Sequence, residues 1–411
     1  TFDLDSQLKE ISSKRFSSKD KNLLRDSLLK ITNSVISPPN GLWHRDVRKL
    51  EILRDRYELI VSSNLGVLEK IYWLIEDAKR YGTLPFAGLA RAGFISVQLL
   101  KSLVAIGLFS IADYEAFLAS VSSVTGQLTH DRLVLDKATF LARYGHLRPG
   151  TYNIESLRYD ESPESYFDWE DQPVTPKQGK PFSPTSTQLR EISSLLKTHD
   201  LKPKASELLD FMKAAIELRE MAKFYFTRNL SDALSLIVKV GEQYKISRED
   251  LAYCDITVFK ESHIAAANTN SILLSSIEQG KELHAQTLRT SLPPLISEPQ
   301  DVWAFEWPEA LPTFISHKQV TALVAEPDFH GGLAGKIVCI PNADPGFDWL
   351  FAHPLAGLIT AWGGPNSHMA IRAGELGLPA VIGTGEVLYR RLSRAKRLHI
   401  DCSDQRIEVM T

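Results

Sequence analysis

The sequence predicts a multidomain protein of the α plus α/β class, in which a large helical domain precedes a small α/β domain. Three observations lead to this prediction. Apolar residues recur at helical spacing through residues 1–295, short β-branched runs alternate with glycine turns through 320–411, and a stretch at 296–319 has neither period. A chain of 411 residues has ample length for two or three domains.

The composition is that of an ordinary soluble globular protein. Hydrophobic residues make up 44% of the chain and charged residues 24%, and the net charge of −3 favours neither nucleic acid nor a membrane surface as a partner. The three cysteines have neither metal-ligand spacing nor a disulfide pattern, which predicts a reducing, cytoplasmic location. The apolar run at 86–111 is interrupted by Arg91 and Lys101, so we interpret it as a buried helix and expect no membrane span.

The helical part is predicted in two blocks. We expect helices at 46–63, 65–81 and 133–143, then a loop at 160–187 that is rich in proline and glycine, and further helices at 186–196, 204–229 and 232–244. The stretch at 296–319 is interpreted as a hinge linker, because proline and tryptophan are frequent in it and no periodicity is present.

The small α/β domain is predicted from short apolar strands. We expect them at 320–325, 336–340, 356–360 and 380–382, with a terminal hairpin formed by 397–401 and 406–409. A short helix should begin at Asn366 or Ser367 and end at Gly377, which Pro379 follows. His368 then lies in the first helical turn, where free N–H groups and the helix dipole favour an anion. A histidine that carries a phosphoryl group suits this position.

Two further clusters contain basic and aromatic side chains. One runs from Lys79 to Phe86 and leads to Arg91; the other, at 143–153, contains Tyr144, His146, Arg148 and Tyr152 in a glycine- and proline-rich turn. Such turns hold binding residues on a rigid frame, and an arginine there can grip a carboxylate or phosphate. Solvated caps explain the same residues equally well.

A helix face in the second helical block carries two more cations. Arg219 and Lys223 are four residues apart, so they lie on the same side of the predicted helix. They are candidates for neutralising a transferred phosphate, and an ordinary charged helix face is the equally good alternative.

The ordered pattern from Gly363 to Gly383 resembles the phosphohistidine, or swivelling, domain of the phosphoenolpyruvate-utilising enzymes. That family includes phosphoenolpyruvate synthase, pyruvate phosphate dikinase and rifampicin phosphotransferase. The resemblance implies that His368 is phosphorylated on Nε2 and carries the group between two active sites. Thr360, Gly363, Gly364 and Ser367 are then candidate phosphate ligands. Gly374 departs from the pattern, because the best-known members have arginine there.

The two basic and aromatic clusters are similar to those in the helical acceptor-binding domain of phosphoenolpyruvate-synthase-like proteins, some of which belong to capsule polysaccharide biosynthesis. One member of that group is an amide kinase for L-glutamine. The resemblance therefore implies that Arg91, Tyr144, His146, Arg148 and Tyr152 bind a small polar acceptor, L-glutamine first. We add Arg219 and Lys223, the two cations on one helix face, to this candidate acceptor-binding set.

The sequence contains no glycine-rich ATP loop and no recognisable carboxylate pair for Mg²⁺. Family members of this type place ATP and Mg²⁺ in a separate ATP-grasp domain. We therefore expect a phosphotransferase whose ATP-grasp domain lies outside this chain, in cis or in trans, and no metal site within the chain. A non-enzymatic phosphocarrier or regulatory module is the alternative from another class. A phosphoenolpyruvate synthase is less well supported, since no phosphoenolpyruvate-binding barrel is recognisable.

Overall fold

The computed structural model describes residues 1–410 except 12–15, 39, 123, 168, 170–181, 263–268, 291, 293–295, 297, 304–310, 326–331 and 366. The chain divides into two compact units, which are taken separately below. Unit 1 comprises 1–64, 73–128 and 177–230, and unit 2 comprises 65–72, 129–176 and 231–411. The division does not follow the predicted boundary near 295, because parts of the helical region fall in unit 2.

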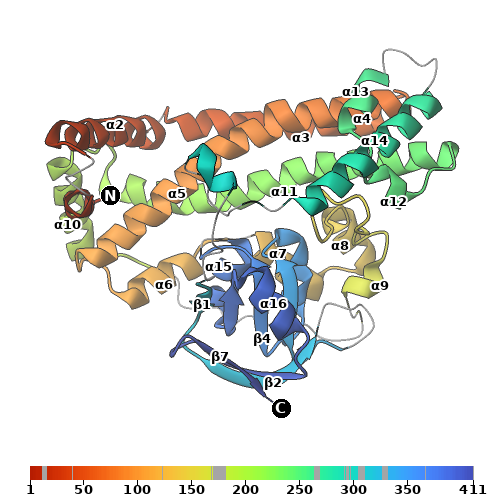
Figure 1. The fold of residues 1–411 in the computed structure, drawn as a ribbon. Helices are drawn as coiled ribbons and strands as arrows, with labels where there is room; N and C mark the ends of the chain where they lie inside the picture. Colours follow the sequence, from red (N-terminus) through yellow and green to blue (C-terminus); the bar gives the residue numbers. More distant parts are fainter. Residues whose placement is uncertain are drawn as a thin grey trace. The chain divides into compact units, whose positions relative to one another are not determined.

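Unit 1 is helical (Figure 1). Its members are α1 (Leu4–Glu10), α2 (Ser18–Ile36), α3 (Leu42–Ser62), the π-helix η1 (Ala78–Thr83), α5 (Leu84–Ala105), α6 (Ile111–Ala119) and α10 (Ser186–Thr198). Three helices, α4 (Val67–Asp77), α7 (Val124–Val134) and α11 (Ala205–Gln243), contribute residues to both units. Reciprocal side-chain caps fix the starts of α2, α6 and α10, at Ser17, Ser110 and Thr185.

The core of unit 1 forms where α5 packs against its neighbours. Leu99, Leu100 and Leu103 of α5 are almost fully buried, and Leu208 and Met212 of α11 join them in one cluster. The helical run from Val67 to Ala105 is long and apolar enough to cross a membrane by length and composition, and 39% of its most apolar window is buried within the protein. A core helix passes the same test, and the burial of α5 is what a core helix requires.

Unit 2 contains the remaining helices and the sheet. The helices are α8 (Lys137–Tyr144), α9 (Pro163–Tyr166), α12 (Arg248–Leu251), α13 (Ile256–Ser262), α14 (Thr269–Arg289), α15 (His368–Leu376) and α16 (Gly385–Ser393), with 3₁₀ turns η3 (Pro299–Val302) and η4 (Pro345–Ala352). The strands are β1 (Thr313–Ile315), β2 (Gln319–Ala325), β3 (Ile337–Asn342), β4 (Gly357–Trp362), β5 (Ala380–Ile382), β6 (Arg397–Asp401) and β7 (Arg406–Met410).

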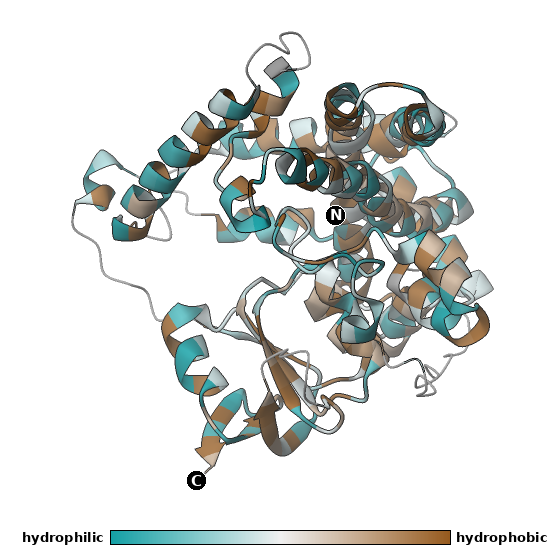
Figure 2. Cartoon of the chain, turned by 90° about the vertical axis from the view of Figure 1, so that its right-hand side faces the viewer, coloured by the Kyte–Doolittle hydropathy of each residue, from teal (hydrophilic) through white to brown (hydrophobic). Residues whose placement is uncertain are grey.

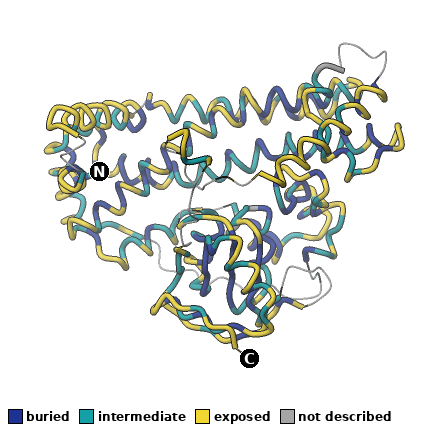
Figure 3. The backbone as a smooth tube through the Cα atoms, viewed as in Figure 1, coloured by how far each residue is buried: buried dark blue, intermediate teal, exposed yellow. Residues whose placement is uncertain are grey.

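The seven strands form one mixed sheet with the order β1-β5-β4-β3-β2-β6-β7. Strands β2 to β5 are parallel, whereas β1 pairs antiparallel with β5, and β6 and β7 form an antiparallel hairpin beside β2. The middle strands are buried and the hairpin is largely exposed (Figure 3). Figure 2 shows the same contrast in hydropathy, with the middle of the sheet mostly in brown. Parallel strands covered by helices have this pattern.

The predicted strands at 320–325 and 380–382, the terminal hairpin and the short helix that Gly377 ends all occur in the structure. Gly377 has φ of +60°, the left-handed conformation that glycine adopts at helix ends. Parts of the predicted loop at 160–187 and of the predicted hinge at 296–319 lie outside the described residues.

Three element predictions need correction. The single helix expected at 133–143 is two helices, because Asp136 adopts an extended conformation and its carboxylate caps the start of α8 through Thr139 N. The break expected near Leu230 is absent, and α11 runs through it as one helix of 39 residues. The hinge range contains strand β1, which belongs to the sheet because it pairs with β5.

Candidate functional site

The turn between β4 and α15 is shaped by two glycines that nothing larger can replace. Gly363 has φ of +140°, and a Cβ there would lie 2.7 Å from Ala343 Cβ. Gly383 has φ of +75°, and a Cβ there would lie 2.5 Å from the carbonyl oxygen of Gly363. Gly364 faces open space. The first two glycines therefore keep the backbone close-packed, and Gly364 leaves room at the helix mouth.

His368 is the first residue of α15, as the sequence predicts. Its N-cap residue, Ser367, is extended and makes no side-chain cap, and the Ser367 hydroxyl is buried without a hydrogen bond to a described residue. Ser367 therefore places no side-chain oxygen on the N–H groups of the first turn of α15, a position at which the helix dipole favours an anion.

Asp348 lies beside this histidine. Its Oδ1 is 2.6 Å from His368 Nε2, and the side chains of Asp348 and His368 are 7% and 15% exposed. An ionised carboxylate only accepts hydrogen bonds, so Nε2 carries the proton in this arrangement. The topology explains the meeting. Residues Pro345–Ala352 follow the carboxyl end of β3, α15 follows that of β4, and these strands are parallel neighbours.

Sequence reasoning missed Asp348, which is 20 residues before His368. Asp348 lies in the 3₁₀ turn η4, and no spacing rule links this turn to the histidine.

Thr360 has a different environment from the one expected of a phosphate ligand. It is fully buried in β4, and its hydroxyl accepts a hydrogen bond from Gly383 N at 3.1 Å. Its carbonyl accepts from Thr384 N and from the Thr384 hydroxyl. These bonds connect the start of α16 to β4. Thr360 therefore has a structural role next to the turn that contains Gly363.

Arg372 was also missed, although it lies one turn after His368 on the same side of α15. It is 7% exposed, and its Nη1 donates to Glu375 Oε2 at 2.7 Å. Its Nε and Nη2 are buried and make no hydrogen bond with the part of the chain that the structure describes. The signal was available, because Gly374 lacks the arginine expected in the motif and Arg372 supplies one two residues earlier.

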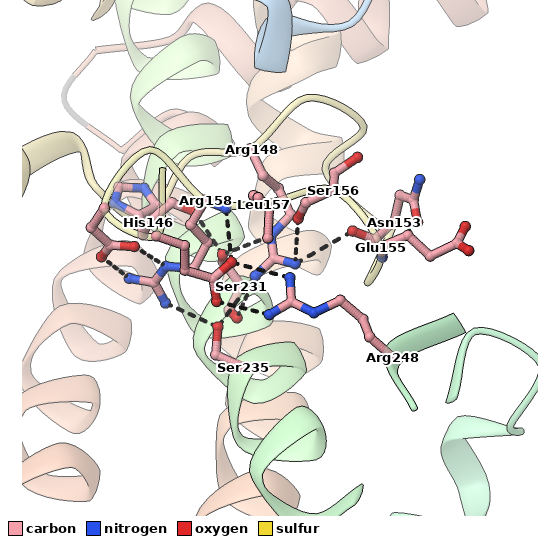
Figure 4. A network of polar contacts seen from close by, with 12 residues as sticks. His146, Arg148, Asn153, Glu155, Ser156, Leu157, Arg158, Ser231, Ser235 and Arg248 are labelled. Carbon is pink, nitrogen blue, oxygen red and sulfur yellow. Dashed lines mark hydrogen bonds and ion pairs between the residues drawn. The ribbon is translucent and has the colours of Figure 1, made fainter. Parts of the chain in front are cut away.

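Arg148 is a structural residue in unit 2 (Figure 4). It is 2% exposed, and all of its guanidinium nitrogens donate to neutral oxygens. Those oxygens are Ser231 Oγ and O, Ser235 Oγ, Asn153 O and Ser156 O, at 3.2–3.4 Å. Burial lowers the pKa of Arg148 to about 10, so it stays charged at neutral pH. The expected grip on an acceptor anion is not free to form, because the donors already have partners.

The other three expected residues of this turn have unequal access to solvent. Tyr144 is buried and donates to Asp131 Oδ2 at 2.8 Å, and burial raises the pKa of its phenol. His146 is 4% exposed, and its carbonyl accepts from Ser231 Oγ at 2.6 Å. Tyr152 is 66% exposed. All three belong to unit 2, as His368 does.

The remaining acceptor candidates belong to unit 1. Arg91 lines a pocket of about 210 Å³ together with Arg45, Asp46 and Lys49. Burial raises the pKa of Asp46, although Lys49 and Arg91 oppose the shift. The pocket therefore joins three cations and one carboxylate, an arrangement that suits a small zwitterion or anion.

Arg219 and Lys223 follow on α11. The Arg219 guanidinium stacks over Phe94 at 5.1 Å from the ring centroid, and burial lowers its pKa. Lys223 is half-buried. The structure thus brings Arg91 and Arg219 into the same unit, with Gly93 packed against the Arg219 side chain.

The described residues contain no group of three or more His, Cys, Asp or Glu side chains that could hold a metal ion. That ATP and Mg²⁺ bind outside this chain stays a prediction.

Comparison with known proteins identifies the part of the chain around His368. Residues 332–405 match the family described as "PEP-utilising enzyme, mobile domain". This match relates the part of the chain around His368 to the PEP-utilising enzymes. A stretch of 78 residues of the chain is also similar, at 38% identity, to the rifampicin phosphotransferase of Streptomyces sviceus. That stretch covers 19% of this chain and 9% of the relative. The similarities support the phosphotransferase class, and each covers less than a fifth of the chain.

Proposed function

We propose that this chain is the phosphoryl-carrying and acceptor-binding part of an ATP-dependent phosphotransferase of the cytoplasm. His368 Nε2 would take a phosphoryl group from ATP on an ATP-grasp domain, in cis or in trans, and pass it to a small polar acceptor. The proposal rests on the position of His368, which is the first residue of α15 and lies within the matched mobile domain. The N-cap residue before it, Ser367, does not cap the helix with its side chain.

The chemistry needs a neutral imidazole with a free Nε2 lone pair. An unperturbed histidine has a pKa near 6.5, so such an imidazole is abundant at neutral pH. The phosphoryl group then forms a bond to Nε2 as its bond to the donor oxygen of ATP breaks, and the remainder of the nucleotide leaves, in a phosphotransferase of the dikinase type. Both steps depend mainly on positioning and on neutralising charge, for which the N–H groups of α15 and the Arg372 guanidinium are at hand.

For the acceptor we propose an amino-acid amide, L-glutamine first, as in capsule polysaccharide biosynthesis. The pocket with Arg91, Asp46 and Lys49 supports a zwitterionic ligand, since its cations suit a carboxylate and Asp46 suits an ammonium group. Arg219 and Lys223 in unit 1, and Tyr152 and His146 in unit 2, complete the proposed set. Arg148 stabilises the turn in which Tyr152 and His146 lie.

Intact-mass measurement on the full-length protein tests the carrier step. Incubation with Mg·ATP should add the mass of one phosphoryl group, and His368→Asn should remove the adduct. Candidate acceptors are then added, and ³¹P NMR is used to follow a new N–P or O–P signal. An adduct that persists in His368→Asn, or no adduct in the native protein, would contradict the proposal.

A non-enzymatic phosphocarrier is the second candidate. The internal bonds of Arg148 favour it, because they remove one expected acceptor ligand. The two functions differ in a thermal-shift titration with L-glutamine. An enzyme should gain stability that Arg91→Ala abolishes, whereas a pure carrier should show no shift.

A further inference from the structure

The 3₁₀ turn η4 (Pro345–Ala352) touches two functional parts of unit 2 at once. On one side it packs on α15 and presents Asp348 to His368 Nε2. On the other side it contacts the segment 144–167, which carries the basic and aromatic turn. One short element therefore joins the carrier histidine to the turn in which acceptor residues are proposed.

The contacts with the segment 144–167 are specific. The Tyr159 hydroxyl donates to Gly346 O at 3.1 Å, and the Thr151 hydroxyl donates to Asp344 Oδ1 at 3.2 Å. The Trp349 indole, 2% exposed, meets the Tyr166 ring edge to face with centroids 5.6 Å apart. Both the backbone and the side chains of η4 are thus engaged with this segment.

On the opposite side, Asp348 occupies the nitrogen on which the proposed chemistry depends. While the carboxylate accepts the Nε2 proton, Nε2 has no lone pair to offer to a phosphorus atom. For attack, the proton has to move to Nδ1 through solvent and the hydrogen bond has to break. After transfer, a doubly charged phosphoryl group on Nε2 would stand where Asp348 stands, and like charges at this separation repel strongly.

We propose that Asp348 is a positioning residue that holds His368 in the unphosphorylated form, and that phosphorylation of Nε2 expels it and loosens η4 from the segment 144–167. The phosphorylation state of the carrier is thereby communicated to the acceptor turn. This inference rests on the proposed role of His368 as the carrier.

Chemical phosphorylation tests the first half without an ATP site. Potassium phosphoramidate supplies the phosphoryl group: an Nε2–P bond forms, the P–N bond of the reagent breaks, and ammonia leaves. Asp348→Ala should accelerate the labelling of His368 by about tenfold, the equivalent of one charge-assisted hydrogen bond. Asp404→Asn, in the exposed turn between β6 and β7, is the matched control and should leave the rate unchanged. An unchanged or slower rate in Asp348→Ala would overturn the assignment.

A spectroscopic readout separates positioning from general loosening of the fold. In ¹⁵N NMR at a pH where the ring is neutral, His368 should show a protonated Nε2 in the native chain. In Asp348→Ala the signal should move toward the tautomer mixture of a free imidazole. A native spectrum that already shows the mixture would contradict the proposed hydrogen bond.

Hydrogen–deuterium exchange tests the second half. After phosphoramidate treatment, amide exchange should rise in both 344–352 and 144–167, and treated His368→Gln should show no rise. Asp348→Ala should show the faster exchange before any treatment. If the native chain gains the phosphoryl mass but exchange in 144–167 stays the same, the coupling is wrong and the carrier function stands. The carrier function itself fails if the full-length native protein gains no phosphoryl mass from Mg·ATP.

Discussion

Gly346 of η4 lies directly against the backbone of Arg148, so that a Cβ at position 346 would stand 2.1 Å from the Arg148 carbonyl oxygen. The same Cβ would be 2.8 Å from Pro149 Cα. Only backbone atoms meet at this point, and neither chain can give way as a flexible side chain can. The contact of η4 with the turn at 143–153 therefore depends on a glycine.

Gly346→Ala should separate η4 from this turn. Overpacking of this kind costs about 1–3 kcal/mol, and we expect a loss of that size in urea unfolding. In the full-length protein, phosphorylation of His368 by Mg·ATP should continue while acceptor-dependent turnover falls. Gly332→Ala is the control, because a Cβ there meets nothing within 4 Å. Equal turnover in Gly346→Ala and Gly332→Ala would show that the contact has no part in transfer.

Arg148 should prove more important for stability than for acceptor binding. Arg148→Ala removes one donor from each of five internal oxygens, of which Ser235 Oγ keeps a second donor in Arg158 Nη1, so we expect a loss of about 2–4 kcal/mol in urea unfolding. Arg148→Lys should recover little, because one ammonium cannot reach the acceptors of a planar fork.

The exposed Arg406→Ala serves as the reference for Arg148 and should change stability by less than about 0.5 kcal/mol. If Arg148→Ala unfolds like the native protein yet loses acceptor turnover, Arg148 is a ligand after all.

The cap of α6 should make stability depend on pH. Hydrogen bonds from the Ser110 backbone and hydroxyl lower the pKa of Asp113 below its usual value of about 3.9. The folded chain then binds fewer protons at this carboxylate than the unfolded chain does, so stability rises with pH. The stabilisation by the Asp113 carboxylate is present above pH 4 and is lost as the pH falls through the pKa that Asp113 has in the folded chain. Urea unfolding between pH 6 and 3 should show a shallower acid loss in Asp113→Asn, and an identical slope would contradict the effect.

Local patterns in the sequence predict much of the α/β domain, because each element there is specified by its own residues. The β-branched run at Ala380–Ile382 is a strand, and Gly377 ends α15 because it can adopt positive φ. The position of His368 at the helix start follows from the same short-range signals. The division at Asp136 was also a local signal, an aspartate cap that the apolar period obscured.

The contacts around His368 and Arg148 join residues that are far apart in the sequence, and the periodicity of apolar residues does not predict such contacts. Asp348 reaches His368 because β3 and β4 are parallel neighbours, a fact that emerges only when the sheet is assembled. Arg148 has the composition of an anion ligand, but Ser231, 83 residues later, takes its donors. Sequence can name such residues as polar and interesting, but only tertiary structure decides whether a donor is already used.

We expect Arg372 to destabilise the unphosphorylated chain and to stabilise the phosphohistidine once His368 is phosphorylated. Two nitrogens of the buried Arg372 guanidinium make no bond to described residues, so burying this charge lowers the free energy of unfolding of the unphosphorylated chain. An apolar side chain of similar length removes this desolvation cost. Arg372→Met should therefore leave the unphosphorylated chain equally stable or more stable by about 1 kcal/mol. In Arg372→Met the phosphohistidine should be less stable, because the positive charge one turn from His368 is lost.

The measurement for Arg372 is the amount and lifetime of phosphohistidine, followed by ³¹P NMR after phosphoramidate treatment. We expect both to fall by about tenfold in Arg372→Met, the equivalent of one charge-assisted hydrogen bond. Arg391→Met, on the exposed side of α16, is the matched control and should retain the native lifetime. A native lifetime in Arg372→Met, combined with higher stability, would mean that the buried charge serves neither the fold nor the phosphoryl group.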